Sequence, residues 1–149
     1  MGSLMQVVAD GSRFMLKLDE GEDLFATLGQ FALSLGVRAA AVVMGIGQVR
    51  SATIAFWNGK EYAPKEITTP HELVSLQGTI AEADGQPSVH LHVALGAPDH
   101  GILGGHLMRA VIGILGEIRI DAFPGRAFGR PLDEDLGLRV LDLETGPVP

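Results

Sequence analysis

The chain has 149 residues, no cysteine and a formal net charge of −7. A chain of this length suits one compact domain rather than two independent cores. The absence of cysteine excludes a disulfide framework and a thiolate metal site, so any metal must be held by histidine and carboxylate. Lysine and arginine are scattered along the chain without a basic run, which disfavours direct nucleic-acid binding.

The apolar content of the chain bears on its location and assembly. No apolar run approaches the ~20 residues of a membrane span, and the start lacks the regions of a secretory signal, so we expect a soluble, cytoplasmic protein. Hydrophobic residues make up 46% of the chain, which is high for a soluble domain and predicts burial between subunits. Residues 1–4 are interpreted as a cloning remnant or disordered start, residues 5–145 as the domain and residues 146–149 as a tail.

A strand and a helix are predicted at the start of the domain. Apolar residues at alternate positions predict a strand over residues 14–18. Five apolar residues then recur at helical spacing on one face: Leu24, Leu28, Phe31, Ala32 and Leu35. The acidic residues 22–23 favour the positive end of the helix dipole, and Gly36 is placed to end the helix.

The remaining chain has the pattern of successive strands separated by turn signals. Strands are expected over residues 38–44, 49–57, 61–68, 73–81, 88–95, 110–120 and 138–143. The separators are Gly45-Ile46-Gly47, the hairpin signal Asn58-Gly59 and Asp84-Gly85-Gln86-Pro87. Within residues 110–120, alternation places Ile112, Ile114, Ile118 and Ile120 on one face.

This element order predicts an α+β fold: a single compact domain with a largely antiparallel β-sheet packed against one main helix. One helix can cover only one face of the sheet. Several strands nevertheless have apolar residues on both faces, as at Val42 and Val43, so we expect the second face to meet another subunit.

Three histidines form the strongest functional signal. Alternation along a strand puts His90 and His92 on one face and the apolar residues between and around them on the other. With His106, which follows Gly104-Gly105, they could converge on one divalent ion and leave a coordination position free. The alternative is a set of hydrogen-bonded histidines without metal. The two glycines either allow a close approach of the backbone to the site or simply make a turn.

Other candidate residues are weaker. Glu117 and Glu72 could orient an imidazole or act as a base on metal-bound water, although ordinary sheet-face carboxylates are the simpler interpretation. His71 and His100 adjoin turns and are expected at the surface. The segment from His71 to Ser75 lacks the second histidine of a zinc-protease helix, and Gly45-Ile46-Gly47 lacks the third glycine of a dinucleotide fingerprint.

Several short motifs occur in an order and spacing typical of one family. They are Gly45-Ile46-Gly47-Gln48-Val49, the segment at residues 72–81, Asp84-Gly85 with Pro87, His90-Leu91-His92, Gly104-Gly105-His106-Leu107 and Glu117-Ile118. On these motifs the sequence resembles the plants-and-prokaryotes conserved (PPC) domain, in its stand-alone prokaryotic type, from about residue 14 to residue 143.

The resemblance implies a homotrimer and, as in some prokaryotic members, a zinc ion held by the three matching histidines, His90, His92 and His106. Plant members are described as DNA-binding through an AT-hook, Arg-Gly-Arg-Pro. Here the nearest match is Gly129-Arg130-Pro131, with Phe128 in place of the first arginine and no basic residue beside it. The plant partner-contact motif also survives only in part, at residues 71–74.

Three functions follow from these features. The favoured hypothesis is a homotrimeric metal-binding module, with zinc or another divalent metal, that takes a small anionic ligand at the open metal position. A small zinc-dependent hydrolase or lyase is one alternative, and it requires a base such as Glu117 or Glu72. A DNA-associated regulator without its own AT-hook is the other, and the net charge of −7 opposes it.

Overall fold

The computed structural model describes residues 5–143 of the chain. Its elements in chain order are β1 (Gln6–Asp10), β2 (Arg13–Asp19), α1 (Leu24–Leu35), β3 (Ala40–Trp57), β4 (Tyr62–Ile67), β5 (His71–Ala83), β6 (Gln86–Gly96), β7 (Ile102–Ala122), β8 (Leu132–Asp133) and β9 (Leu138–Arg139). The expected remnant at residues 1–4 and the tail at 146–149 lie outside the described residues.

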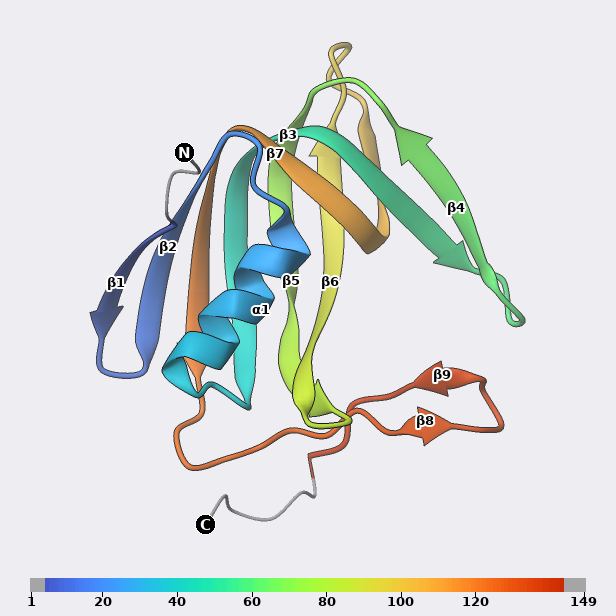
Figure 1. Ribbon diagram of the computed structural model, residues 1–149. Coiled ribbons are helices and arrows are strands. Elements are labelled where there is room, and N and C mark those ends of the chain that lie inside the picture. Colours follow the sequence, from blue (N-terminus) through green and yellow to red (C-terminus); the bar gives the residue numbers. More distant parts are fainter. Residues whose placement is uncertain (1–4, 144–149) are drawn as a thin grey trace.

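Seven antiparallel strands form the main sheet, in the order β1-β2-β7-β6-β5-β3-β4 (Figure 1). Strand β7 also pairs with β3, so the pairings β3–β5, β5–β6, β6–β7 and β7–β3 close a ring of hydrogen-bonded strands. The two short strands β8 and β9 form a separate hairpin. The predicted α+β fold, with a largely antiparallel sheet and one main helix, is confirmed in the described residues.

The single helix of the described residues begins and ends as the sequence predicts. The Asp23 side chain accepts a hydrogen bond from the Ala26 amide at 2.9 Å, which caps the N-terminus. At the other end Gly36 adopts a left-handed φ of 64°, a conformation that glycine tolerates without a steric penalty. No helix in the described residues combines the length and apolar character needed to cross a membrane.

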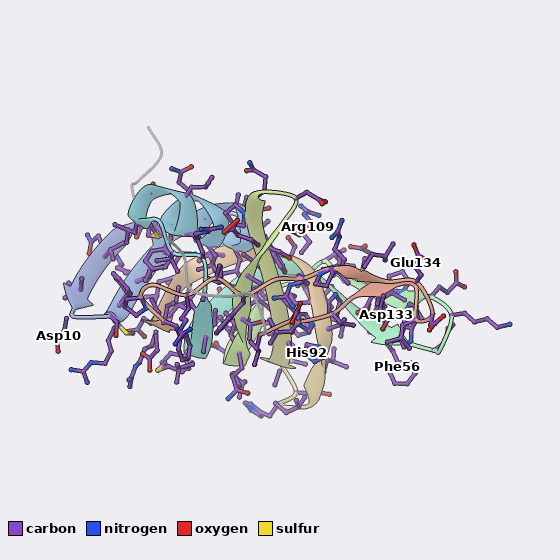
Figure 2. The ribbon with its side chains drawn as sticks, turned by 90° about the horizontal axis from the view of Figure 1, so that it is seen from below. Asp10, Phe56, His92, Arg109, Asp133 and Glu134 are labelled. Atoms are coloured by element: carbon purple, nitrogen blue, oxygen red, sulfur yellow. The ribbon has the colours of Figure 1, made fainter. Side chains whose placement is uncertain are left out.

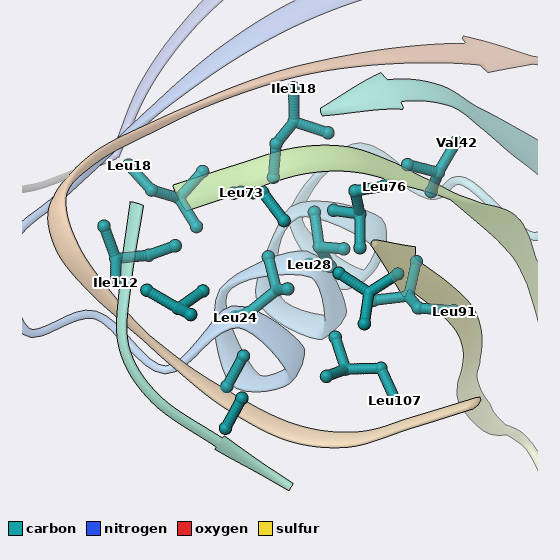
Figure 3. Close-up of a cluster of buried hydrophobic side chains, with 14 of the residues drawn as sticks. Leu18, Leu24, Leu28, Val42, Leu73, Leu76, Leu91, Leu107, Ile112 and Ile118 are labelled. Atoms are coloured by element: carbon teal, nitrogen blue, oxygen red, sulfur yellow. The ribbon is translucent and has the colours of Figure 1, made fainter. Parts of the chain in front are cut away.

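The core lies between the helix and the ring of strands. Leu24 and Leu28 of α1 point into a cluster that also contains leucines of the strands, including Leu76 and Leu91 (Figure 3). These four side chains are fully buried, and burying each one stabilises the fold by roughly 1.5–3 kcal/mol. The core therefore covers one face of β6 and leaves the opposite face available for polar residues.

The sequence prediction of two strands over residues 38–57 is wrong, because β3 runs continuously from residue 40 to residue 57. The segment Gly45-Ile46-Gly47 belongs to this strand rather than to a turn. A Cβ atom at Gly47, whose φ is +140°, would lie 2.1 Å from the Leu115 carbonyl oxygen. Glycine therefore serves here to let β3 and β7 approach each other closely.

The expected alternation along residues 110–120 is also interrupted. Ile112, Ile118 and Ile120 are buried, but Ile114 is 67% exposed. In the β3–β7 register Gly116 faces Gly47 and Ile112 faces Val49, so three residues of β7 stand against one of β3. This bulge breaks the two-residue period and turns Ile114 outward.

Strand ends and edge strands differ most from the sequence prediction. Strand β1 was not predicted, because its five residues are all exposed and lack an apolar alternation. Strand β9 covers only residues 138–139 of the expected 138–143. The two hairpin signals are confirmed: Asn58-Gly59 joins β3 to β4, and Asp84-Gly85 joins β5 to β6 with φ angles of 53° and 76°.

Candidate metal centre

Strand alternation on β6 sets the orientation of two of the three histidines. Leu91 and Leu95 are fully buried against the core, which places His90 and His92 on the opposite face of the strand. The third histidine comes from the neighbouring strand, because His106 of β7 is the direct register partner of His92. The predicted grouping of the three histidines is thus present in the folded chain.

The three imidazoles are close enough to share one ion. Their candidate ligand nitrogens all lie within 4.8 Å of one another. The ring centroids are 5.1 Å apart for His90–His92, 5.2 Å for His90–His106 and 5.5 Å for His92–His106. Three imidazole nitrogens gathered in this way are a ligand set that suits zinc, whose bonds to nitrogen are about 2.0–2.1 Å long.

The His106 ring shows the clearest need for a further partner. Its Nδ1 atom is buried, and within the described residues it has no hydrogen-bond partner. The ring is held in place by Tyr62, which stacks on it with a centroid distance of 4.4 Å and an interplanar angle of 17°. A buried polar atom without a partner costs free energy, and a bound metal ion would satisfy this nitrogen.

Gly104 and Gly105 lie within β7 and do not form a turn. A Cβ atom at Gly104 would lie 2.7 Å from the Val93 carbonyl oxygen, and one at Gly105 would lie 2.8 Å from the Ala55 carbonyl oxygen. Of the two interpretations that the sequence left open, close backbone approach is the correct one. The glycines let β7 fit tightly between β6 and β3, and this fit positions His106 opposite His92.

Burial and nearby positive charge lower the pKa values of two of the three histidines. Burial, followed by the positive charge of Arg130 and the two neighbouring histidines, lowers the pKa of His90 from 6.5 to about 4. Burial and the nearby His92 also lower the pKa of His106. A neutral imidazole has the free lone pair that a metal requires, so the environment favours metal ligation over protonation.

The lowered pKa of His90 predicts how the stability of the metal-free protein depends on pH. The unfolded chain takes up a proton near pH 6.5, whereas folded His90 does so only near pH 4. The contribution of His90 to the free energy of unfolding should therefore fall as the pH is lowered through this window and level off below it. Chemical denaturation at a series of pH values would measure this. In a His90→Asn variant the slope should be shallower, and an unchanged slope would contradict the assignment.

A cavity of about 620 Å³ adjoins His90 and His106. It is also lined by Tyr62 of β4 and by Arg130, which sequence analysis did not place at the site. In the sequence, Gly129-Arg130-Pro131 indicates only a partial AT-hook. Sequence spacing alone gives no indication that residue 130 packs against β5 and β6.

The other candidate residues lie away from the triad. Glu72 and Glu117 line a different cavity, together with Ile46, Val74 and Ile114. Within one chain the structure therefore does not bring either carboxylate to the histidines as an orienting partner or base. His71 is only 8% exposed and its Nδ1 lies 2.9 Å from the Thr69 carbonyl oxygen, so the expected surface position is wrong. His100 is exposed, as expected.

The fold and site together define a single α+β domain that carries a three-histidine group on one face of a closed antiparallel ring. The Plants and Prokaryotes Conserved (PCC) domain matches residues 5–124, and the chain belongs to this family. The resemblance inferred from the sequence motifs is thereby confirmed.

Solved structures from bacteria and archaea have the same fold. A metal-containing protein from Archaeoglobus fulgidus is 36% identical, with a TM-score of 0.81, over 93% of this chain and 97% of the other. A PPC protein from Pyrococcus horikoshii is 26% identical, with a TM-score of 0.82, over 95% and 96%. A candidate DNA-binding protein from Bacteroides thetaiotaomicron is 26% identical, with a TM-score of 0.88, over 95% and 99%. Comparison with curated proteins found no match.

Proposed function

We propose that the protein is a metal-binding module in which His90, His92 and His106 hold one divalent ion and leave a coordination position for a small anionic ligand. The observation that carries this proposal is the buried Nδ1 atom of His106, which has no partner within residues 5–143. The proximity of the three ligand nitrogens supports it. Zinc is the preferred ion because it suits three imidazoles with one open position.

The similarity to the metal-containing protein of Archaeoglobus fulgidus supports the same proposal. A bound zinc ion would supply Lewis acidity at the open position. Because Glu72 and Glu117 line another cavity, the described chain places neither of these carboxylates beside that position. The proposal is therefore ligand binding rather than hydrolysis or elimination.

We further propose that the module assembles as a homotrimer. Ile46, Val74 and Ile114 line one cavity on the outside of the ring and are 43%, 48% and 67% exposed. Apolar side chains gathered in this way favour burial against another protein surface. A second copy of the chain is the expected occupant, since the family resemblance implies threefold assembly.

DNA binding is not part of this proposal, although one similar structure is a candidate DNA-binding protein. The net charge of −7 is repeated in every copy of the chain and opposes association with a phosphate backbone. Arg130, the arginine of the partial AT-hook, is only 7% exposed. It is therefore not available to enter a minor groove.

Metal analysis and mass measurement in solution test the proposal together. The protein should be purified without added metal or an affinity tag and analysed by inductively coupled plasma mass spectrometry and light scattering. We expect about one equivalent of zinc for each chain, in a particle of three chains. A protein that contains no metal and takes up none on titration would refute the metal site, and a monomer would refute the trimer.

A further inference from the structure

Arg130 is a buried cation for which the described chain supplies no counter-ion. Its residue is 7% exposed, and burial lowers the pKa of its guanidinium. None of the ion pairs formed within residues 5–143 includes it. Since an unpaired buried charge is costly, a group of this kind indicates a missing anion.

The guanidinium is nevertheless held firmly in one orientation. Its Nε atom donates to Ser88 Oγ at 3.0 Å, and its Nη2 atom donates to Thr79 Oγ1 at 2.8 Å. Both acceptors are neutral hydroxyls, so they fix the group without cancelling its charge. The Nη1 atom makes no hydrogen bond to the described residues, and Nη2 has a second hydrogen besides the one donated to Thr79, so the guanidinium retains donors for an oxyanion.

The chain segment that carries Arg130 is also fixed. The Phe128 carbonyl oxygen accepts a hydrogen bond from the Glu82 amide at 2.8 Å, which ties the segment to β5. Arg139 donates from Nη1 to the Arg130 carbonyl oxygen at 3.0 Å and from Nη2 to Asp84 Oδ2 at 2.7 Å. The cation is thus positioned before any ligand arrives, which lowers the entropic cost of binding.

Arg130 shares a sheet face and a cavity with the triad. Ser88, which accepts from it, lies two residues before His90 on β6, and Thr79 is the register partner of His90 on β5. The same cavity of about 620 Å³ is lined by Leu138, Val140 and Leu141. Figures 1 and 2 show the β8–β9 hairpin projecting on the same side of the molecule as the β3–β4 arm, and residues of both line the cavity.

We propose that this cavity binds a small organic acid, with its carboxylate on the Nη1–Nη2 edge of Arg130 and its apolar body against Leu138, Val140 and Leu141. The volume lies within the range of small-molecule sites and exceeds what a metal ion and its water would fill. A planar carboxylate matches the fork of a guanidinium, and the leucine and valine side chains favour a hydrocarbon portion. The inference rests on the proposed function only in placing a metal ion beside the ligand.

The test uses calorimetric titration of the full chain with hexanoate, its neutral counterpart hexanamide and inorganic phosphate. We expect hexanoate to bind more tightly than either of the other two. Arg130→Gln should weaken hexanoate binding by roughly 10- to 100-fold, the loss expected for a hydrogen bond to a charged group. Arg126→Gln is the matched control, because Arg126 is exposed in the same segment, outside the cavity lining, and carries the same charge.

Binding of the organic acid can be tested separately from binding of the metal ion. The Arg130-dependent difference should persist in metal-free protein, and the metal content of Arg130→Gln should equal that of the wild type. If Arg130→Gln does not fold, Arg130→Lys replaces it, since lysine keeps the charge but cannot form two parallel bonds; hexanoate binding should again weaken. Equal hexanoate binding by the wild type and Arg130→Gln would overturn the inference, and so would tighter binding of phosphate than of hexanoate. It would also be overturned if the wild type bound no anion and Arg130→Gln only changed the mass of the particle in solution.

Discussion

Replacement of His92 by alanine is expected to abolish metal binding while leaving the fold intact. His92 supplies one of three imidazoles to the proposed site, and the two that remain cannot complete it. We expect the metal affinity to fall by more than the roughly 10–100-fold typical of removing a residue that only orients a metal ligand through a hydrogen bond. Because the His92 side chain is exposed, its truncation leaves no cavity in the core.

Metal content measured by mass spectrometry and circular dichroism spectra would check this result. His100→Asn is the matched control, because it removes an exposed imidazole outside the triad, and asparagine tolerates the left-handed φ of 68° at that position. The control should retain its full metal content. A His92→Ala protein with the same metal content as the wild type would contradict the three-histidine assignment.

Substitution of Gly78 by alanine should destabilise the protein by about 3 kcal/mol or more, at the upper end of the cost of overpacking. An added Cβ atom would lie 1.9 Å from the His90 carbonyl oxygen and 3.0 Å from the Leu91 Cα atom. These are backbone atoms of the strand that carries two of the ligands, so β6 would have to move away from β5. We therefore expect metal affinity to fall together with stability.

Thermal and denaturant unfolding, with metal titration of the folded fraction, would measure both effects. Gly29→Ala is the opposite control. Gly29 lies in α1, where a Cβ atom would meet nothing within 4 Å, and alanine favours a helix over glycine by roughly 0.5–1 kcal/mol. That variant should be slightly stabilised, whereas a Gly78→Ala protein of wild-type stability would disprove the close contact.

Local sequence signals predicted an element correctly where the residues of that element alone determine its hydrophobic pattern and its ends. The helix followed from its apolar period, from Asp23 and from Gly36, all of which act within one or two turns. The failures involve contacts between distant strands. Gly47 breaks a strand pattern locally but is required because β3 passes close to Leu115 of β7, a contact that spacing along the chain does not reveal.

The same distinction applies to the candidate site. Alternation was sufficient to place His90 and His92 on one face, and the family motif pointed to His106. Tyr62 and Arg130 could not be predicted, because they reach the site from β4 and from the segment after β7. Glu72 and Glu117 are candidates by the chemistry of their carboxylates, which carries no information on position, and the ring of strands places them at a different cavity.

The three histidines all lie on the hairpin formed by β6 and β7, which affects the order in which the site forms during folding. His90 and His106 are 16 positions apart on strands joined by a short turn, in which the Ala97 amide donates to the Gly101 carbonyl oxygen at 2.8 Å. Hairpins form in about 1–10 μs, whereas closing the ring requires pairings as distant as Ala40 with Ala122. An ion could therefore be captured by a hairpin that is still forming. The neighbouring cavity, which depends on Tyr62 and Arg130, would appear only when the whole domain has folded.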